Sequence, residues 1–151
     1  MKRFQFRLKP LKRLKEAKYE EAERKARRQS AILDEEREKL RGLFEAKKGI
    51  REKSAQFHRE LNFLMLEIAR RNEQGINHLI TAQELRIEEA RKTLVELQKE
   101  TTEALKEKKI FEKLEEKALE DYKKEYLRDQ QKKLDDFLPR NVFEDEEGDT
   151  W

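Results

Sequence analysis

The sequence predicts an all-α protein, a long antiparallel two-helix coiled-coil hairpin with flexible termini. Charged residues make up 47% of the 151-residue chain, and hydrophobic residues only 35%. A compact globular domain of this length normally carries more apolar side chains, whereas this charge content is typical of disorder or of long coiled-coil helices. The apolar residues recur at heptad spacing, which favours the coiled coil over disorder.

The strongest helical signal is the segment 103–137, which contains no Gly and no Pro. It is built mainly from Glu, Lys, Leu, Ala and Gln, which lose little on entering a helix. Its apolar residues form one narrow stripe made of Ala104, Phe111 and Ala118, with Leu114, Tyr122 and Tyr126 nearly aligned to it. A helix with one narrow apolar stripe needs a second helix to cover that stripe.

The chain opens with an arm, residues 1–9, in which Phe4, Phe6 and Leu8 alternate with polar residues. Lys9 precedes Pro10, which disfavours helix at Lys9, while Pro10 itself suits the first turn of a helix. We interpret the arm either as a hydrophobic staple on the first helix or as a docking arm for another protein.

A first helix is expected over residues 10–71 and a second over 77–138. We use the name seam for the two alternating heptad positions that hold the apolar residues of each helix. In the first helix the seam comprises Leu33, Leu40, Leu61 and Ile68 at one position and Leu43, Ile50, Phe57 and Leu64 at the other. In the second helix it includes Ile87, Leu94, Leu97 and Phe111. Polar residues at Lys47 and Ser54 interrupt the seam, which lowers stability or fixes register.

The turn between the helices is expected at residues 72–76. Asn72 and Gly75 follow a basic stretch at Arg70 and Arg71, and such residues are helix stop signals. A single unbroken helix that pairs with other chains is the competing arrangement. Pro139 is expected to end the second helix, and the acidic segment 139–151 is expected to be a disordered tail.

Catalytic chemistry is not indicated by the sequence. There is no Cys, the four Gly are scattered, and His58 and His78 are the only histidines, each more often a solvated side chain on such a helix than a ligand. We therefore expect no enzyme activity, no cofactor and no metal. The basic run at residues 24–28 is interleaved with acids and lacks stacking aromatics, so no nucleic-acid partner is expected.

A cytoplasmic location is expected, because the N-terminus lacks the apolar core of a secretory signal. The longest apolar run, residues 63–66, is too short to cross a bilayer, so direct membrane insertion is not expected. Binding of residues 1–18 to a membrane surface is an alternative, since Phe and Leu there alternate with Lys and Arg.

Both ends of the chain carry a family resemblance. Residues 4–15 read F-x-F-x-L-x-x-L-x-x-L-K, residues 108–117 approximate E-K-x-F-E-K-L-E-E-K, and Arg128 to Asp136 read R-D-Q-Q-K-K-L-D-D. Over residues 1–137 the chain resembles the flagellar export protein FliJ, a small coiled-coil component of the flagellar type III secretion apparatus. The resemblance implies an antiparallel two-helix coiled coil that inserts as a central stalk into the hexameric export ATPase and promotes its assembly and activity.

The resemblance also implies partners and contact surfaces. The ATPase ring would be contacted by Phe4, Phe6, Leu8, Leu11, Gln131, Lys132, Leu134 and Asp135. The cytoplasmic domain of the export gate membrane protein would be contacted by Leu40, Leu43, Phe44, Ile76, Leu79, Ile80 and Gln83. Export chaperones freed of their cargo are the third class of partner, and the location would be peripheral to the membrane export apparatus.

The family pattern also implies an alternative turn, at residues 54–62, which is earlier than the turn expected from the stop signals. A structural coiled-coil adaptor or homodimer without a motor partner, and a stalk protein of a related virulence secretion system, remain alternatives to the export stalk.

Overall fold

The computed structural model describes residues 2–138, which form two helices, α1 (Lys9–Arg59) and α2 (Phe63–Phe137), and no strand. The all-α hairpin predicted from composition and heptad spacing is confirmed. The expected disordered acidic tail, residues 139–151, lies outside the described residues. The chain divides into two units: residues 17–106, here called the hairpin unit, and residues 2–16 with 107–138, here called the terminal unit.

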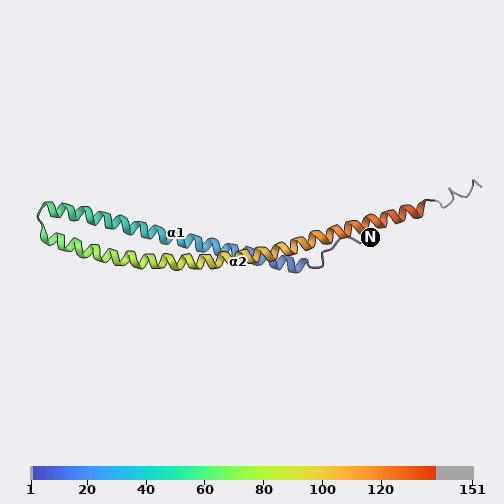
Figure 1. Ribbon diagram of the computed structural model, residues 1–151, viewed down its shortest axis with the longest axis horizontal. Helices are drawn as coiled ribbons and strands as arrows, with labels where there is room; N and C mark the ends of the chain where they lie inside the picture. The colour runs from blue at the N-terminus through green and yellow to red at the C-terminus, as the bar shows by residue number, and fades with distance from the viewer. Residues whose placement is uncertain (1, 139–151) are drawn as a thin grey trace, which may run out of the picture. The chain divides into compact units, whose positions relative to one another are not determined.

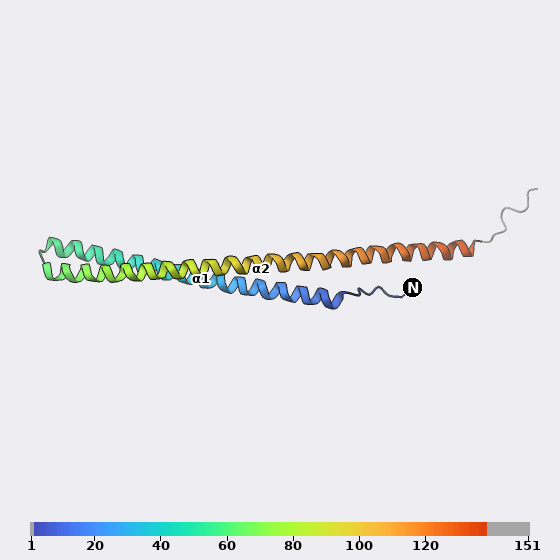
Figure 2. The same ribbon diagram turned by 60° about the horizontal axis from the view of Figure 1, so that its bottom comes forward.

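In the hairpin unit, α1 and α2 run antiparallel and are joined at residues 60–62 (Figure 1; Figure 2). The most buried side chains are Leu33 on α1 and Ala69, Ile80, Gln83 and Ala90 on α2. On α2 these residues are 11, 3 and 7 positions apart, spacings made of three- and four-residue steps, so all of them fall on one face of the helix. The core is therefore a single narrow seam between two helices.

The seam positions predicted within the observed helices mostly point inward. Leu33 is 4% exposed. The half-buried members are Leu40, Leu43, Ile50 and Phe57 on α1, and Ile87, Leu94, Leu97 and Phe111 on α2. A two-helix seam is open on both sides, so half-burial is what most of its residues can reach.

Two glutamines also occupy the seam, where they bond across the hairpin. The Gln83 amide donates to the main-chain carbonyl of Glu36 at 3.0 Å and to the Glu36 carboxylate. The Gln29 amide donates to the carbonyl of Ala90 at 3.1 Å. These bonds satisfy polar groups that would otherwise be costly to bury, and each links a side chain of one helix to the backbone of the other.

The turn predicted at residues 72–76 is wrong, because α2 runs through this segment as regular helix and no described glycine has positive φ. The chain reverses at residues 60–62, at the end of the alternative range 54–62. The reversal is a Schellman motif: the amide of Asn62 donates to the carbonyl of Phe57 (3.0 Å) and that of Leu61 to His58 (3.2 Å).

Leu61 holds the left-handed position of this motif, with φ of 55°. Glycine usually holds that position, because a Cβ is disfavoured there. The helix stop signal at Gly75 therefore predicts the wrong turn, because the real turn has Leu61 at the left-handed position and Gly75 lies inside α2. Asn62 then caps α2, its side-chain oxygen accepting a hydrogen bond from the amide of Met65 at 3.3 Å.

The assignment of Leu61, Leu64 and Ile68 to the seam is also wrong. Their exposed fractions are 69%, 72% and 42%. The prediction continued the heptads of the first helix past Phe57, but α1 ends at Arg59 and the phase restarts in α2. Ala69, 6% exposed, takes the inward position there.

Candidate protein-interaction surfaces

The part of the N-terminal arm that the structure describes ahead of α1, residues 2–8, packs on α2 within the terminal unit. The Phe4 and Tyr122 rings lie 5.4 Å apart between centroids and are tilted by 53°, an ordinary attractive aromatic geometry. The Tyr122 hydroxyl donates a 2.8 Å hydrogen bond to the carbonyl of Lys2. Tyr126 stacks on Tyr122 with a centroid distance of 6.5 Å. The alternation of Phe4, Phe6 and Leu8 thus places three half-buried side chains toward α2.

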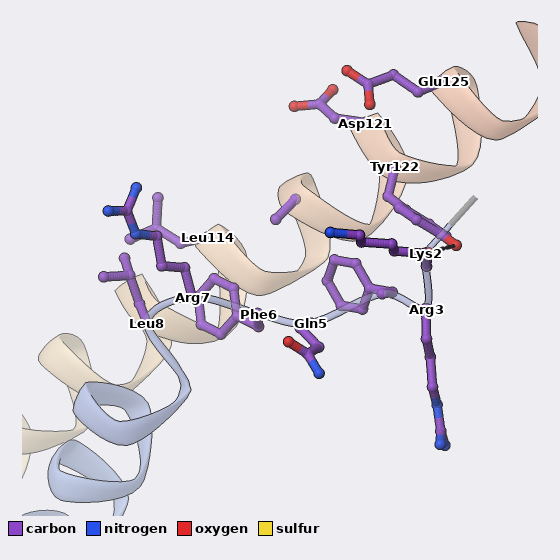
Figure 3. A pocket seen from close by; sticks show the side chains of 12 residues that line it. Lys2, Arg3, Gln5, Phe6, Arg7, Leu8, Leu114, Asp121, Tyr122 and Glu125 are labelled. Atoms are coloured by element: carbon purple, nitrogen blue, oxygen red, sulfur yellow. Dashed lines mark hydrogen bonds between the residues drawn. The ribbon is translucent and has the colours of Figure 1, made fainter. Parts of the chain in front are cut away.

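A hollow of about 870 Å³ lies between the arm and α2 (Figure 3). Figure 3 shows the arm passing along the same part of α2 that carries Leu114 and Tyr122, with Asp121 next to Tyr122 and Glu125 about one turn farther along the helix. The arm contributes Lys2, Arg3 and Arg7 to the lining. The hollow combines an apolar floor with charges of both signs, and the short arm forms one of its walls.

Ion pairs hold the start of α1 to α2 in the terminal unit. The Lys15 ammonium lies 2.7 Å from the Glu107 carboxylate, and Lys12 pairs with Glu115. Hydrogen bonding to Glu115 is the main cause that raises the pKa of Lys12 above its ordinary value. Both lysines occupy inward positions where a coiled coil normally has apolar residues. This contact therefore depends on charge more than on apolar burial.

The end of α2 carries exposed apolar side chains. Among residues 123–138, only Asp129 is not exposed. The exposed fractions are 63% for Leu127, 64% for Leu134 and 85% for Phe137. Leu127 and Leu134 are seven residues apart and Phe137 follows three residues later, so all three lie toward one side of the helix. Exposed apolar residues grouped in this way indicate a protein-interaction surface.

The residues implied as ATPase-ring contacts fall into two separate groups. Phe4, Phe6 and Leu8 contact the part of α2 around Leu114 and Tyr122. The second group is exposed on the last turns of α2 and comprises Gln131, Lys132, Leu134 and Asp135. Leu11 is 45% exposed on α1. The structure thus gathers Phe4, Phe6 and Leu8 on one part of α2, but it does not place them next to the residues at the end of α2.

Four residues on these surfaces are not among the contacts implied by the resemblance: Leu14, Leu127, Phe137 and Tyr122. Tyr122 was visible as part of the apolar stripe of the second helix, and its role as the platform for Phe4 needs the arm in place. The other three are apolar residues outside the seam spacing, and that displacement was the available signal. Leu14, half exposed, is three residues after Leu11 on α1.

The residues implied as export-gate contacts differ widely in exposure. Ile80 and Gln83 are buried in the seam at 7% and 5% exposed, so they cannot serve as a contact surface while the hairpin is closed. Phe44 and Leu79 are 47% and 56% exposed. The half-buried members are Leu40, Leu43 and Ile76.

A second hollow, of about 370 Å³, lies beside this part of the seam in the hairpin unit. Leu43 and Leu79 form apolar lining, and Lys39 and Arg86 add positive charge from α1 and α2 respectively. Gly42 and Ala82 leave room for the hollow because they have little or no side chain. The hollow suits a short apolar side chain from a partner that also carries acidic residues.

Within residues 2–138, no group of three or more His, Asp or Glu side chains is arranged to hold a metal ion. No helix in the described part of the chain is long and apolar enough to cross a membrane.

Comparison with known proteins identifies one family. The family model described as flagellar FliJ protein matches residues 4–147. No curated protein and no solved structure matches the chain significantly. The matched range includes the arm from Phe4 onward, both helices and the hairpin turn.

Proposed function

The chain belongs to the flagellar FliJ family and is thus a component of the flagellar export apparatus; from this we propose that it is the non-enzymatic central stalk of the hexameric export ATPase. In this role it promotes assembly and activity of the ring, contacts the cytoplasmic domain of the export gate and escorts export chaperones. It works in the cytoplasm, peripherally associated with the membrane export apparatus.

The observation that carries this proposal is the surface of the terminal unit. The α2 end exposes Leu127, Leu134 and Phe137 without an inward partner among the described residues of α1 or the arm. A stalk needs an exposed apolar stripe on a stiff support, and the last part of α2, residues 103–137, supplies one because it contains no Gly or Pro. Exposed ion pairs elsewhere are worth only about 0–1 kcal/mol each, so dense mixed charge lets a stalk contact several similar subunits without binding one tightly.

The arm supports the same role. It is held on α2 by the half-buried side chains of Phe4, Phe6 and Leu8 and by one hydrogen bond, with no backbone pairing to α2, so we propose that it can detach. Detachment would present Phe4, Phe6 and the Tyr122 face of α2 to ring subunits. Leu11 and Leu14, both exposed on α1, extend this surface.

ATP hydrolysis by the cognate export ATPase tests the stalk role. The full chain, added below one copy per hexamer, should stimulate hydrolysis. Leu127→Ser with Leu134→Ser should reduce the stimulation, because both side chains leave the proposed contact. Ile32→Ser with Leu85→Ser is the matched control, since both residues are exposed apolar residues of the hairpin unit. No stimulation by a well-folded chain would leave a structural adaptor as the better account.

The gate contact is tested separately with the purified cytoplasmic domain of the gate protein. Phe44→Ala and Leu79→Ala should weaken binding without changing helix content, because both side chains are exposed. Ile80→Ala should instead lower stability, because Ile80 is buried in the seam. Equal binding by all three variants and the unmodified chain would refute this surface.

A further inference from the structure

The hairpin turn exposes a compact group of large apolar side chains. Leu61, Phe63 and Leu64 are 69%, 71% and 72% exposed, and they are almost consecutive in the sequence. Ile68, 42% exposed, follows Leu64 by one helical turn and extends the group along α2. We call Leu61, Phe63, Leu64 and Ile68 the turn patch. Burial in the hairpin does not explain the turn patch, because the inward positions beside it belong to Met65 and Ala69.

Net positive charge lies in the helical turns on either side of the turn patch, while residues 56–69 next to it hold one Arg against two Glu. Residues 47–75 hold seven Lys and Arg against four Glu, which gives a net charge of +3. The other residues of the hairpin unit, 17–46 and 76–106, hold thirteen Lys and Arg against fourteen Asp and Glu, which gives −1. The positive charge of the hairpin unit is thus concentrated toward its turn.

The two helix ends at the turn add to this character. α1 has His58 and Arg59 in its last turn. α2 has no acidic residue in its first turn, which instead reads Phe-Leu-Met-Leu. At the turn, the positive end of the α2 dipole has no carboxylate in its first turn, and the negative end of α1 beside it is offset by Arg59.

We infer that the turn patch is a docking surface for an anionic lipid membrane. Leu and Phe side chains at the end of a hairpin can enter the headgroup region, while Arg59 beside them and Lys53 and Arg70 farther along the helices contact lipid phosphates. A lipid surface accepts projecting side chains without a groove shaped to receive them. The contact is interfacial, which agrees with the finding that no described helix could cross the bilayer.

This surface goes beyond the proposed stalk function and does not depend on it. The ring contacts lie in the terminal unit and the gate contacts around Phe44 and Leu79, while the turn patch lies at residues 61–68. A failure of ATPase stimulation would leave lipid binding untouched, and the reverse is also true.

Vesicle flotation tests the inference with the full chain. We expect the chain to float with phosphatidylcholine vesicles that contain one third phosphatidylglycerol, and to float far less with phosphatidylcholine alone. Added salt should weaken the interaction, because it screens the attraction to lipid phosphates. The triple variant Leu61→Ser, Phe63→Ser, Leu64→Ser should lose about tenfold or more in affinity, since its apolar contact is removed.

The matched control is Ile32→Ser, Leu85→Ser, Val95→Ser, three exposed apolar residues of the same unit away from the turn. This variant should bind vesicles like the unmodified chain. A second pair of variants tests the contribution of charge. The double variant Lys53→Gln, Arg59→Gln should weaken vesicle binding, and the double variant Lys92→Gln, Lys99→Gln, far from the turn, should not. Circular dichroism checks that each variant keeps its helix content.

Tryptophan fluorescence reports whether the turn patch enters the lipid surface. In a chain with Trp151→Phe, Phe63→Trp should shift its emission to the blue when the anionic vesicles are added, and Val95→Trp should not. Several results would overturn the inference. These are no vesicle binding by the full chain, equal binding by the turn-patch variant, loss of binding only when residues 1–8 are deleted, or a turn patch needed solely for capture of the gate domain.

Discussion

The amide of Gln83, 5% exposed on α2, donates to both the backbone carbonyl and the carboxylate of Glu36 on α1. This pair joins the two helices at one defined level of the seam. A slip of the helices would leave a buried amide without partners, so the pair favours a single register.

Replacing Gln83 should therefore cost stability. Gln83→Ala removes the cross-helix hydrogen bonds and part of the packing, and we expect a loss of about 1–3 kcal/mol in the free energy of unfolding. Urea unfolding followed by circular dichroism measures it. Gln98→Ala, an exposed glutamine of the same helix, is the control and should change stability by less than about 0.5 kcal/mol. Similar midpoints for both variants would show that the pair contributes little.

The stability of the protein at acid pH should depend on carboxylates whose pKa is lowered by partners in the folded state. The hydrogen bond from Gln83, followed by that from Lys39, lowers the pKa of Glu36 below its ordinary 4.5. Arginine partners lower the pKa of Glu38, Glu67 and Glu88 in the same direction. A carboxylate with a lower pKa in the folded state stabilises the fold above its unfolded pKa, and this contribution is lost as the pH falls through the folded pKa.

We accordingly expect the melting temperature to stay nearly level from neutral pH down to about pH 5 and to fall below about pH 4.5. Glu36→Gln should be less stable at neutral pH and should show a smaller loss on acidification. Thermal melts across this pH range provide the measurement. A melting temperature that rises on acidification would mean that repulsion between acids outweighs their pairing.

Leu33, which is buried, and its neighbour Ile32, which is exposed, allow a test of which face of α1 forms the seam. Leu33 is 4% exposed and Ile32 is 47% exposed on the same turn of α1. Leu33→Ala should cost about 2–3 kcal/mol, near the low end for core truncation, because a two-helix seam can relax around the lost volume. Ile32→Ala should cost less than about 0.5 kcal/mol. Denaturant unfolding separates them, and equal effects would mean that the seam is assigned to the wrong face.

Gly75→Ala distinguishes the two turn positions. In the structure Gly75 is helical, and an added Cβ meets no atom within 4 Å. Alanine there should stabilise the protein by about 0.5–1 kcal/mol, because it is the better helix former. A turn at residues 72–76 would require the opposite sign. Gly42→Ala, which is equally unhindered inside α1, should stabilise by a similar amount.

The arm contact can be followed by limited proteolysis. Phe4→Ala removes the ring contact with Tyr122, worth about 0.5–1.5 kcal/mol, so the arm should open more often and trypsin should cleave after Arg7 about two- to tenfold faster. Gln5→Ala, an exposed neighbour, should cleave at the unmodified rate. Mass spectrometry of the early products gives the rates. Equal rates for both variants would mean that the aromatic contact does not hold the arm.

The sequence alone determined the fold class, the two helices and most of the seam, because heptad spacing follows directly from helix geometry and shows in residues such as Leu33, Leu94 and Leu97. It also carried the family resemblance later matched by the FliJ family model. It did not determine the turn, where Leu61 takes a left-handed position usually given to glycine, or the placement of Leu64, which depends on the turn.

Only the tertiary structure decided which side chains meet. The pairing of Gln83 with Glu36 and of Phe4 with Tyr122 joins residues 47 and 118 positions apart in the sequence, and no local pattern specifies such partners. The register set by the turn at residues 60–62 brings Gln83 level with Glu36. The same turn leaves Leu61, Phe63 and Leu64 outside the seam and therefore exposed.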